Sequence, residues 1–251
     1  MRRLDGIARA FPEPAKLFLR PIYRAFLSFA QEINATRSNR ESERIHRASA
    51  RLFFSLRGRK RLKLNLACGI LVKPSWVNID LSIPSSANTV LFEHPDTVLI
   101  NHDLRGGLPL DDESCDYIYS SHFFEHLDCD DGIRLMRECY DKLSTGGIFR
   151  MALPNFRLLF EKYLANDSSL YNLLDQYVDE MLPGLQKTMV DYVNFGVYQY
   201  GQHKCIYDED RVVEILTRIG YSSAIVSSYR EGIDEDLVAH RRYSFYVEAV
   251  K

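Results

Sequence analysis

The stretch LNLACG at residues 64–69 decides the fold of this 251-residue chain. It is a β-prone run that ends in a small, glycine-containing turn. A second run, WVNID at 76–80, follows and ends in a carboxylate. A turn of this kind at the carboxyl edge of a parallel strand lets a ligand lie against bare backbone, and an acidic residue at the next strand end can accept hydrogen bonds from two ribose hydroxyls. The order of the two runs predicts a nucleoside-binding edge of an α/β sheet.

The rest of the chain from Arg61 onward alternates short β-prone runs with longer helical segments, which is typical of a parallel sheet covered by helices. A helix is predicted at 130–143, with Ile133, Met136 and Tyr140 on one face, and another at 208–219, before Gly220. Residues 155–200 interrupt the alternation and predict a helical insertion that caps the substrate. We expect seven strands, at 62–67, 76–80, 97–101, 115–119, 147–153, 222–228 and 242–249.

The first 60 residues differ from the rest in charge. They hold fourteen Lys or Arg against five Asp or Glu, whereas residues 61–251 hold eighteen against twenty-nine. We therefore divide the chain into a basic helical N-terminal extension, 1–60, and an α/β domain, 61–251. A helical pattern at 12–32 has one apolar side and a basic stripe. Three uses of this arm remain open: packing on its own body, lying on an anionic membrane surface, and, least favoured, binding nucleic acid.

Composition points to a protein of the cytoplasm, soluble or peripheral at the inner membrane face. Hydrophobic residues make up 46% of the chain, enough for a core. There is no run of about 18 uncharged apolar residues and no signal-peptide pattern at the N-terminus. The five cysteines are odd in number and have no CxxC spacing, which argues against a disulfide framework and a structural zinc site. We expect reduced, packed thiols.

Polar residues follow two further predicted strands. His102-Asp103 ends the third strand, and Ser120-Ser121-His122 ends the fourth. The carboxyl ends of parallel strands meet at one edge of a sheet, so these side chains are expected near the turn at 67–69 and Asp80.

With these motifs the chain resembles the class I S-adenosylmethionine-dependent methyltransferases, of the type 11 kind. The resemblance is carried by the phrase LPLDDESCD at 108–116, by the HxxEHL turn at 122–127, and by GGIFRMALPN at 146–155. It is strong over 62–160 and moderate over 200–230. It implies a Rossmann-like α/β fold, a seven-stranded mostly parallel sheet with helices on both faces, and S-adenosyl-L-methionine as cofactor.

The resemblance also implies a set of cofactor-binding residues. Asn65 stands at the family's usual acidic position and Ala67 at its first glycine. For Asp103, an ion pair with Arg105 explains the residue as well as adenine binding does. The implied set is Asn65, Ala67, Cys68, Gly69, Asp80, Asp103, Leu104, Ser120 and Ser121.

The link between the first two strands is unusually short. Only ten residues separate Gly69 from Asp80, and they include Pro74, so a full helix cannot fit. This spacing resembles a sub-branch of the family that is linked to polysaccharide pathways. It disfavours a nicotinamide site, which would need GxGxxG opening a helix that receives a pyrophosphate.

Methyl transfer is an in-line displacement, so the enzyme must align the reactants and remove a proton from a hydroxyl acceptor. The candidate catalytic residues are His122, Glu125, His126 and His203. The alternatives are that Glu125 and His126 brace their turn and that His203 makes a structural hydrogen bond. No metal-ligand set is recognised. An aromatic group lines an acceptor pocket or belongs to the core; its members are Tyr192, Phe195, Tyr198 and Tyr200.

The sequence thus predicts S-adenosylmethionine-dependent methyl transfer to a hydroxyl or amine of a small molecule or glycan. Two alternatives stay open. One is a non-catalytic methyltransferase-like binding module, which Asn65 and Ala67 slightly favour. The other is a nucleic-acid methyltransferase, which rests on the basic arm alone.

Overall fold

The computed structural model describes residues 44, 47–83, 88–174, 178, 186–234 and 242–251. The chain divides into two compact units, Met1–Ala50 and Arg51–Lys251, and the second contains the sheet. The basic helix expected at 12–32 lies outside the described residues. Among the helices that are described, none has the length and apolar character needed to span a bilayer.

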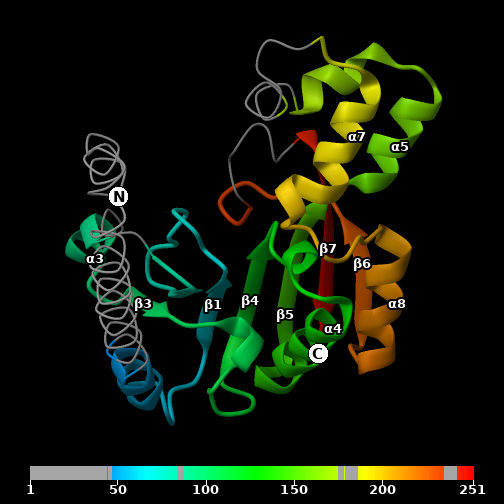
Figure 1. The fold of residues 1–251 in the computed structure, drawn as a ribbon. Helices are drawn as coiled ribbons and strands as arrows, with labels where there is room; N and C mark the ends of the chain where they lie inside the picture. The colour runs from blue at the N-terminus through cyan, green and yellow to red at the C-terminus, as the bar shows by residue number, and fades with distance from the viewer. Residues whose placement is uncertain (1–43, 45–46, 84–87, 175–177, 179–185, 235–241) are drawn as a thin grey trace, which may run out of the picture. The chain divides into compact units, whose positions relative to one another are not determined.

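Seven strands form one mixed sheet in the order β3-β2-β1-β4-β5-β7-β6 (Figure 1). Neighbours from β3 to β5 run parallel, and β7 is antiparallel to both β5 and β6. The order reverses between β1 and β4, and α/β sheets bind ligands at such a switch point. The expected strands and the Rossmann-like sheet are confirmed: β1 Leu62–Leu66, β2 Val77–Asp80, β3 Val98–Asn101, β4 Cys115–Ser121, β5 Leu143–Pro154, β6 Ser223–Ser227 and β7 Ser244–Val250.

Two amphipathic helices, α4 (Cys129–Lys142) and α8 (Glu209–Ile219), pack on each other and on β5, β6 and β7. Asp208 caps α8 by accepting a hydrogen bond from the Arg211 amide, and Gly220 follows the helix with a φ of 120°. Both helices lie where the sequence predicts them. A short helix, α3 (Asn88–Glu93), connects β2 to β3.

The packed side of α4 differs from the prediction. Ile133 is 36% exposed, whereas Met136 is buried as expected, together with Leu135 and Cys139. The cause lies at Gly132, where a Cβ atom would be only 2.6 Å from the Tyr207 hydroxyl. This close approach centres the buried stripe on Gly132 and turns Ile133 outward.

Residues 67–76, which join β1 to β2, contain no helix, as the spacing predicts. Two buried amides hold this loop in its place. Asn65 Nδ2 donates to the Leu71 carbonyl and to Asn78 Oδ1, each at 2.9 Å. Asn78 Oδ1 also accepts from the Lys73 amide at 2.8 Å, and Asn78 Nδ2 donates to the Lys73 carbonyl at 2.9 Å. The side chains therefore supply partners that a crossover helix would have found in its own backbone.

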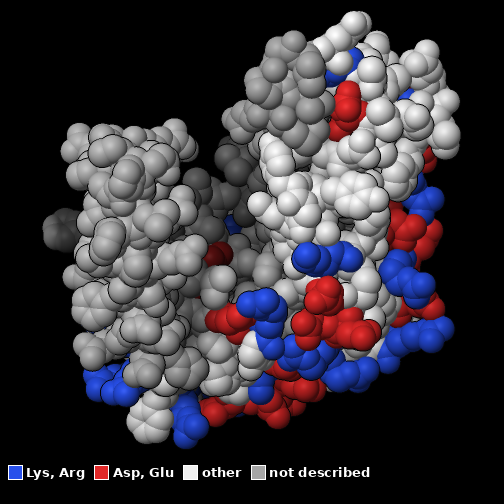
Figure 2. Space-filling model, viewed as in Figure 1, with Lys and Arg blue, Asp and Glu red and all other residues white. Residues whose placement is uncertain are grey.

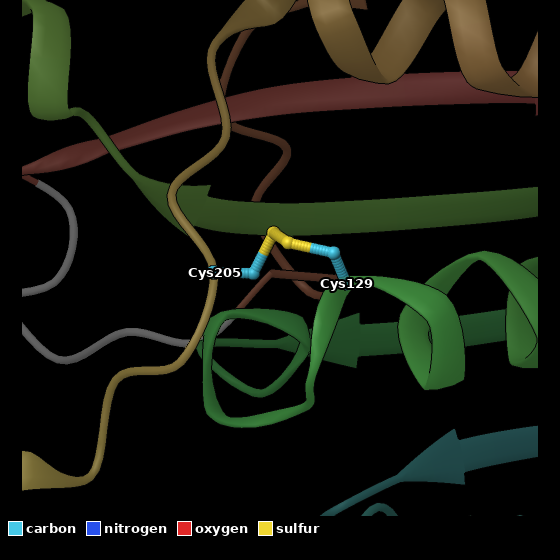
Figure 3. The surroundings of a disulfide bond; sticks show 2 residues. All are labelled: Cys129 and Cys205. Atoms are coloured by element: carbon cyan, nitrogen blue, oxygen red, sulfur yellow. A yellow bond between two sulfur atoms is a disulfide. The ribbon is translucent and has the colours of Figure 1, made fainter.

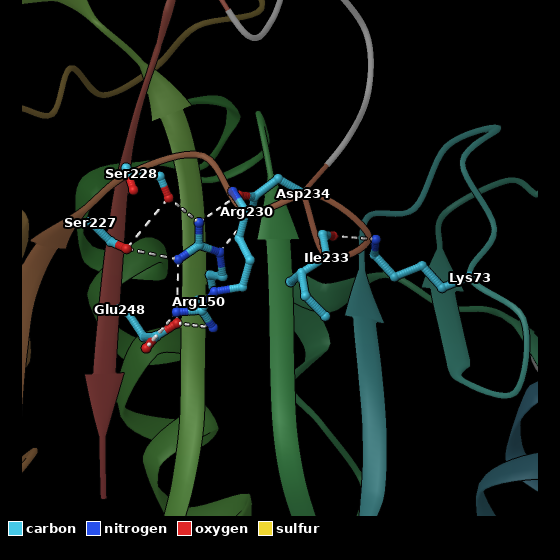
Figure 4. A network of polar contacts seen from close by, with 8 residues as sticks. All are labelled: Lys73, Arg150, Ser227, Ser228, Arg230, Ile233, Asp234 and Glu248. Carbon is cyan, nitrogen blue, oxygen red and sulfur yellow. Dashed lines mark hydrogen bonds and ion pairs between the residues drawn. The ribbon is translucent and has the colours of Figure 1, made fainter.

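A second loop, 228–234, lies over the same face of the sheet as the Lys73 side chain (Figure 4). Arg150 of β5 is fully buried, and its Nε donates to Asp234 Oδ1 at 2.7 Å, while Nη2 donates to the Ser228 carbonyl at the same distance. Lys73 Nζ donates to the Ile233 carbonyl. The buried ion pair thus fixes a loop that contacts the β1–β2 connection.

The expected insertion at 155–200 is helical in its described parts and has a small core of its own. Helices α5 (Phe156–Leu164) and α7 (Met189–Tyr198) pack together beyond the carboxyl ends of β4 and β5 (Figure 1). Asn155 begins α5 by accepting a hydrogen bond from the Leu158 amide. The core of the insertion is separate from the main core. It consists of Phe156, Leu159, Leu170, Leu174, Val178, Tyr192, Phe195 and Tyr243.

The expectation of five reduced thiols is wrong for one pair. Cys129, at the start of α4, forms a disulfide with Cys205, in the loop before α8, with a Cα–Cα distance of 5.4 Å (Figure 3). The two are 76 residues apart, so only the tertiary fold reveals the pair. Cys68, Cys115 and Cys139 are buried free thiols, as expected. Disulfides persist in oxidising compartments and are rare in the cytoplasm, so the pair counts against the cytoplasmic localisation. That localisation stays a proposal.

Replacing both paired cysteines by serine is expected to lower the free energy of unfolding by about 2–4 kcal/mol, because the bond closes a long loop in the unfolded chain. Urea denaturation measures the loss. The matched control is wild-type protein in reductant, which should lose a similar amount. Thiol titration of denatured, unreduced protein should find three free thiols; five would contradict the bond.

Candidate functional site

The turn after β1 has a left-handed backbone at two positions. Ala67 and Gly69 both have a φ of 52°. An L-residue adopts this region at a cost, which explains why a glycine would suit position 67. Cys68 is 3% exposed and its amide donates to the Ile79 carbonyl at 3.1 Å, so it anchors the turn to β2. A Cβ built on Gly69 would meet nothing within 4 Å, so the turn opens onto free space.

Asp80 ends β2 beside this turn and is half-buried. Its Oδ2 accepts from the Gly69 amide at 2.9 Å, and its Oδ1 accepts from the Ser82 amide at 3.1 Å. A carboxylate has about four acceptor sites, so each oxygen retains a lone pair for a ligand hydroxyl. The structure therefore brings together Gly69 and Asp80, as the sequence predicts.

Asn65 lies beneath the turn rather than at its surface. It is 3% exposed, and its amide is occupied by Leu71 and Asn78. In the described structure it therefore positions the loop, and a ligand would reach it only if this network opened.

Asp103, which follows β3, forms the ion pair with Arg105 that the sequence left open as an alternative to adenine binding. Arg105 Nη2 lies 2.6 Å from Asp103 Oδ2, and the Arg105 amide donates to Asp103 Oδ1 at 3.0 Å. The Arg105 guanidinium holds the pKa of Asp103 below its usual value. Leu104 is 4% exposed and belongs to the main core. Asp103 caps a single 3-10 turn, Leu104–Gly106, and its carboxylate remains 42% exposed.

The end of β4 lies at the switch point of the sheet. Ser120 and Ser121 are buried, and the Ser120 hydroxyl has no hydrogen-bond partner among the described residues. A buried polar atom without a partner costs free energy, so a ligand that hydrogen-bonds to Ser120 would be stabilised there. His122 follows with a φ of 47°, a strained left-handed conformation that turns the chain out of the strand.

The four predicted catalytic residues converge. Glu125 is 1% exposed, and its Oε1 lies 3.6 Å from His122 Nδ1 and 3.9 Å from His126 Nε2. The rings of His126 and His203 meet edge to face at a centroid distance of 4.9 Å. The Lys204 and Cys205 amides donate to the Glu125 carbonyl at 2.7 and 3.2 Å, and this backbone contact joins the two segments.

Both imidazoles of the His126–His203 pair are less basic than usual. Burial lowers the pKa of His203 to about 4, although a hydrogen bond to the Gly196 carbonyl acts in the opposite direction. Burial also lowers the pKa of His126. His203 Nδ1 lies 2.7 Å from the Gly196 oxygen and therefore carries the hydrogen, which leaves Nε2 as the acceptor.

Three residues of the site were missed from the sequence. Ser244, at the start of β7, has its hydroxyl 2.7 Å from His122 Nε2. Tyr207 and Tyr243 are buried with hydroxyls that lack a partner among the described residues. Burial, and then the charge of Glu125, raise the pKa of Tyr207 to about 12. No sequence motif marks these residues, because Ser244 is 122 positions from His122.

The predicted aromatic group divides between core and surface. Tyr192 and Phe195 are 2% and 5% exposed and belong to the core of the insertion. Tyr198 and Tyr200 are 62% and 59% exposed. A cavity of about 660 Å³ lies elsewhere, lined by residues from the far end of α5, such as Tyr163 and Leu164, and from 186–190. It is remote from the strand ends and is not the site described above.

Comparison with known proteins gives one family. Residues 74–151 match a family model described as "Methyltransferase domain". A search of the curated proteins finds no match to the chain.

Among solved structures, the fold is similar to that of an S-adenosylmethionine-dependent methyltransferase from Archaeoglobus fulgidus, with 17% identity, a TM-score of 0.44, and coverage of 82% of this chain and 94% of that one. One from Mesorhizobium loti has 18% identity and a TM-score of 0.45, covering 80% and 96%. A Haemonchus contortus phosphoethanolamine N-methyltransferase 2 in complex with S-adenosyl-L-methionine has 13% identity and a TM-score of 0.44, covering 81% and 51%.

Ala67→Gly is expected to raise the free energy of unfolding by about 0.5–1 kcal/mol, because glycine adopts the left-handed turn without steric cost. Thermal or urea denaturation measures the gain. Ala224→Gly, in β6, is the matched control and should destabilise by a similar amount. Equal losses for the two variants would contradict the strain assigned to Ala67.

Arg105→Gln is expected to lower stability by less than about 1 kcal/mol at pH 7, since the pair with Asp103 is largely exposed. The pKa of Asp103 is depressed in the fold, so the pair's stabilisation is present above the unfolded value of 3.8 and is lost as the pH falls through the lower folded value. Wild type and variant should therefore converge in urea melts near pH 2. Arg137→Gln, an exposed change on α4, is the control, and a pH-independent difference for Arg105→Gln would contradict the ion pair.

Proposed function

We propose that the chain is a class I S-adenosylmethionine-dependent methyltransferase that methylates a hydroxyl or amine of a small molecule or glycan. The match of residues 74–151 to a methyltransferase domain supports this proposal. The observation that carries this proposal is the meeting of two groups at adjacent strand ends. Gly69 and Asp80 form an open turn at the ends of β1 and β2, and His122 leaves β4 beside a buried carboxylate.

The residues at the strand ends fit the cofactor. Asp80 would accept hydrogen bonds from the ribose hydroxyls, and the backbone of Ala67, Cys68 and Gly69 would lie against the ligand. The Ser120 hydroxyl, at the switch point between β1 and β4, has no hydrogen-bond partner among the described residues and would offer the ligand a further polar contact. S-adenosylmethionine, when bound, supplies the activated methyl group on its sulfonium. Asp103 is proposed to bind adenine, and the ligand would have to compete with Arg105 for its carboxylate.

His122 is our proposed proton acceptor. A hydroxyl acceptor must lose its proton as the new carbon–oxygen bond forms, and a histidine can take that proton near neutral pH. Glu125 Oε1 faces His122 Nδ1, and this arrangement favours the tautomer whose basic nitrogen is Nε2, on the side of Ser244. Glu125 is therefore a positioning residue, and His126 and His203 surround it.

The acceptor class is inferred from the insertion and from the basic arm. The insertion lies beyond the strand ends and offers exposed aromatic side chains at Tyr198 and Tyr200, which suit stacking on a sugar or other ring. The arm of 1–60 carries a large excess of Lys and Arg and would suit a lipid-linked acceptor at an anionic inner membrane face. Cytoplasmic localisation belongs to the same proposal.

A nucleic-acid acceptor is less favoured. On the face shown in Figure 2, blue and red side chains alternate over the lower part of the sheet domain, and the insertion above is mostly uncharged. A backbone-binding protein would present one continuous basic surface. The non-catalytic alternative predicts that the cofactor does not bind.

Titration calorimetry tests donor binding. Wild type is expected to bind S-adenosylmethionine, and Asp80→Ala should weaken binding by about 10–100-fold, since charge-assisted hydrogen bonds contribute about 1.5–3 kcal/mol. Asp96→Ala, an exposed change before β3, is the matched control and should bind as wild type does. No binding by wild type would favour the non-catalytic alternative, and unchanged binding by Asp80→Ala would reject the ribose assignment alone.

Formation of S-adenosylhomocysteine over a panel of sugars, glycans and amines tests the transfer. We expect His122→Asn to lose about 100-fold or more in turnover on a hydroxyl acceptor while it still binds the donor, in line with the usual size of acid–base catalysis. Equal activity of wild type and His122→Asn would reject His122 as the proton acceptor. Activity on nucleic acid alone would reject the acceptor class.

A further inference from the structure

The Glu125, His126 and His203 side chains form a donor set that the proposed methyl transfer does not require. Each offers one ligand atom, and these atoms all lie within 4.8 Å of one another. Two imidazoles and one carboxylate are the protein ligands of many catalytic zinc sites, in which the fourth position stays open. No sequence motif indicates this set, because His203 is 77 positions from His126.

We propose that Glu125, His126 and His203 form a binding site for a divalent transition-metal ion of the zinc type. A tetrahedral site with bonds of about 2.0–2.1 Å needs ligand atoms roughly 3.4 Å apart. The separation of Glu125 Oε1 from His126 Nε2 is 3.9 Å and no separation within the set exceeds 4.8 Å, so side-chain rotations must bring the three ligand atoms closer when the metal binds. The same Oε1 lies 3.6 Å from His122 Nδ1, so the carboxylate would have to rotate for Oε2 to take the contact with His122 while Oε1 ligates the metal.

The hydrogen bonds around the two histidines suit metal ligation. A metal-bound histidine donates its other ring N–H to a carbonyl or carboxylate, which fixes the ring and its tautomer. His203 donates from Nδ1 to the Gly196 carbonyl at 2.7 Å, and this leaves Nε2 for the metal. His126 makes a backbone hydrogen bond to Gln202.

The surroundings supply rigidity and further polar groups. The disulfide between Cys129 and Cys205, together with the amides of Lys204 and Cys205 on the Glu125 carbonyl, ties the segment of His126 to that of His203. Tyr207 and Tyr243 are 2% and 5% exposed, and their hydroxyls lack partners among the described residues. Burial, and then the negative charge of Glu125, raise the pKa of both hydroxyls. A metal-bound water is a natural partner for such hydroxyls.

The test measures metal bound by the whole chain without reductant, so that Cys129 and Cys205 stay paired. Purified protein is stripped with chelator, incubated with Zn²⁺, gel-filtered and analysed for zinc. One zinc per chain, with a Kd below about 100 µM, is expected for wild type, and at least about 10-fold weaker binding for His126→Ala and His203→Ala. His94→Ala, an exposed histidine after α3, is the control and should bind like wild type.

A measurement that needs no variant guards against misfolding. Co²⁺ added to wild type should produce a ligand-field spectrum and should shift the ring signals of His126 and His203 in NMR. Absence of stoichiometric zinc, unaltered binding in both alanine variants, or shifts confined to other histidines would each overturn the site. Donor binding at Asp80 is measured separately, so a failure here leaves the proposed methyl transfer untouched, and the reverse also holds.

Discussion

The short connection between β1 and β2 is the constraint on which the cofactor edge depends. Ten residues must return the chain from the carboxyl end of one parallel strand to the start of the next, without a helix to satisfy their backbone. Asn65 and Asn78 take over that role from within the strands. Because these two side chains hold the loop, the Gly69 amide can donate a hydrogen bond to the Asp80 carboxylate, and the turn keeps its open surface.

The elements of the α/β domain could be predicted because their signals are local. Strands such as β1 and β2 are short β-prone runs with polar ends, and α8 has Asp208 before it and Gly220 after it. Likewise, the spacing of Gly69 and Asp80 excluded a helix. The outward turn of Ile133 could not be predicted, since it depends on the contact of Gly132 with Tyr207, which is 75 positions away.

Part of the candidate site could be predicted from a local motif, whereas its arrangement and its distant members could not. The motif HxxEH placed His122, Glu125 and His126 on one turn, and the fold adds His203, Ser244 and the disulfide from distant segments. For Asn65, the position in the motif predicts ligand contact, and the structure adds a second role, because the buried side chain supports the loop. Pairings between distant segments are set by tertiary packing, and a single sequence carries no direct record of them.

The covalent link between Cys129 and Cys205 encloses β5 and the whole insertion, 155–200, in one ring of chain. A protease that cuts a peptide bond inside this ring opens it but does not release either fragment, since the sulfur bridge still joins them. The segments that carry His126 and His203 would then stay adjacent after a cut in the insertion. Parts of the insertion could therefore be replaced or lengthened while the disulfide keeps the segments of His126 and His203 together.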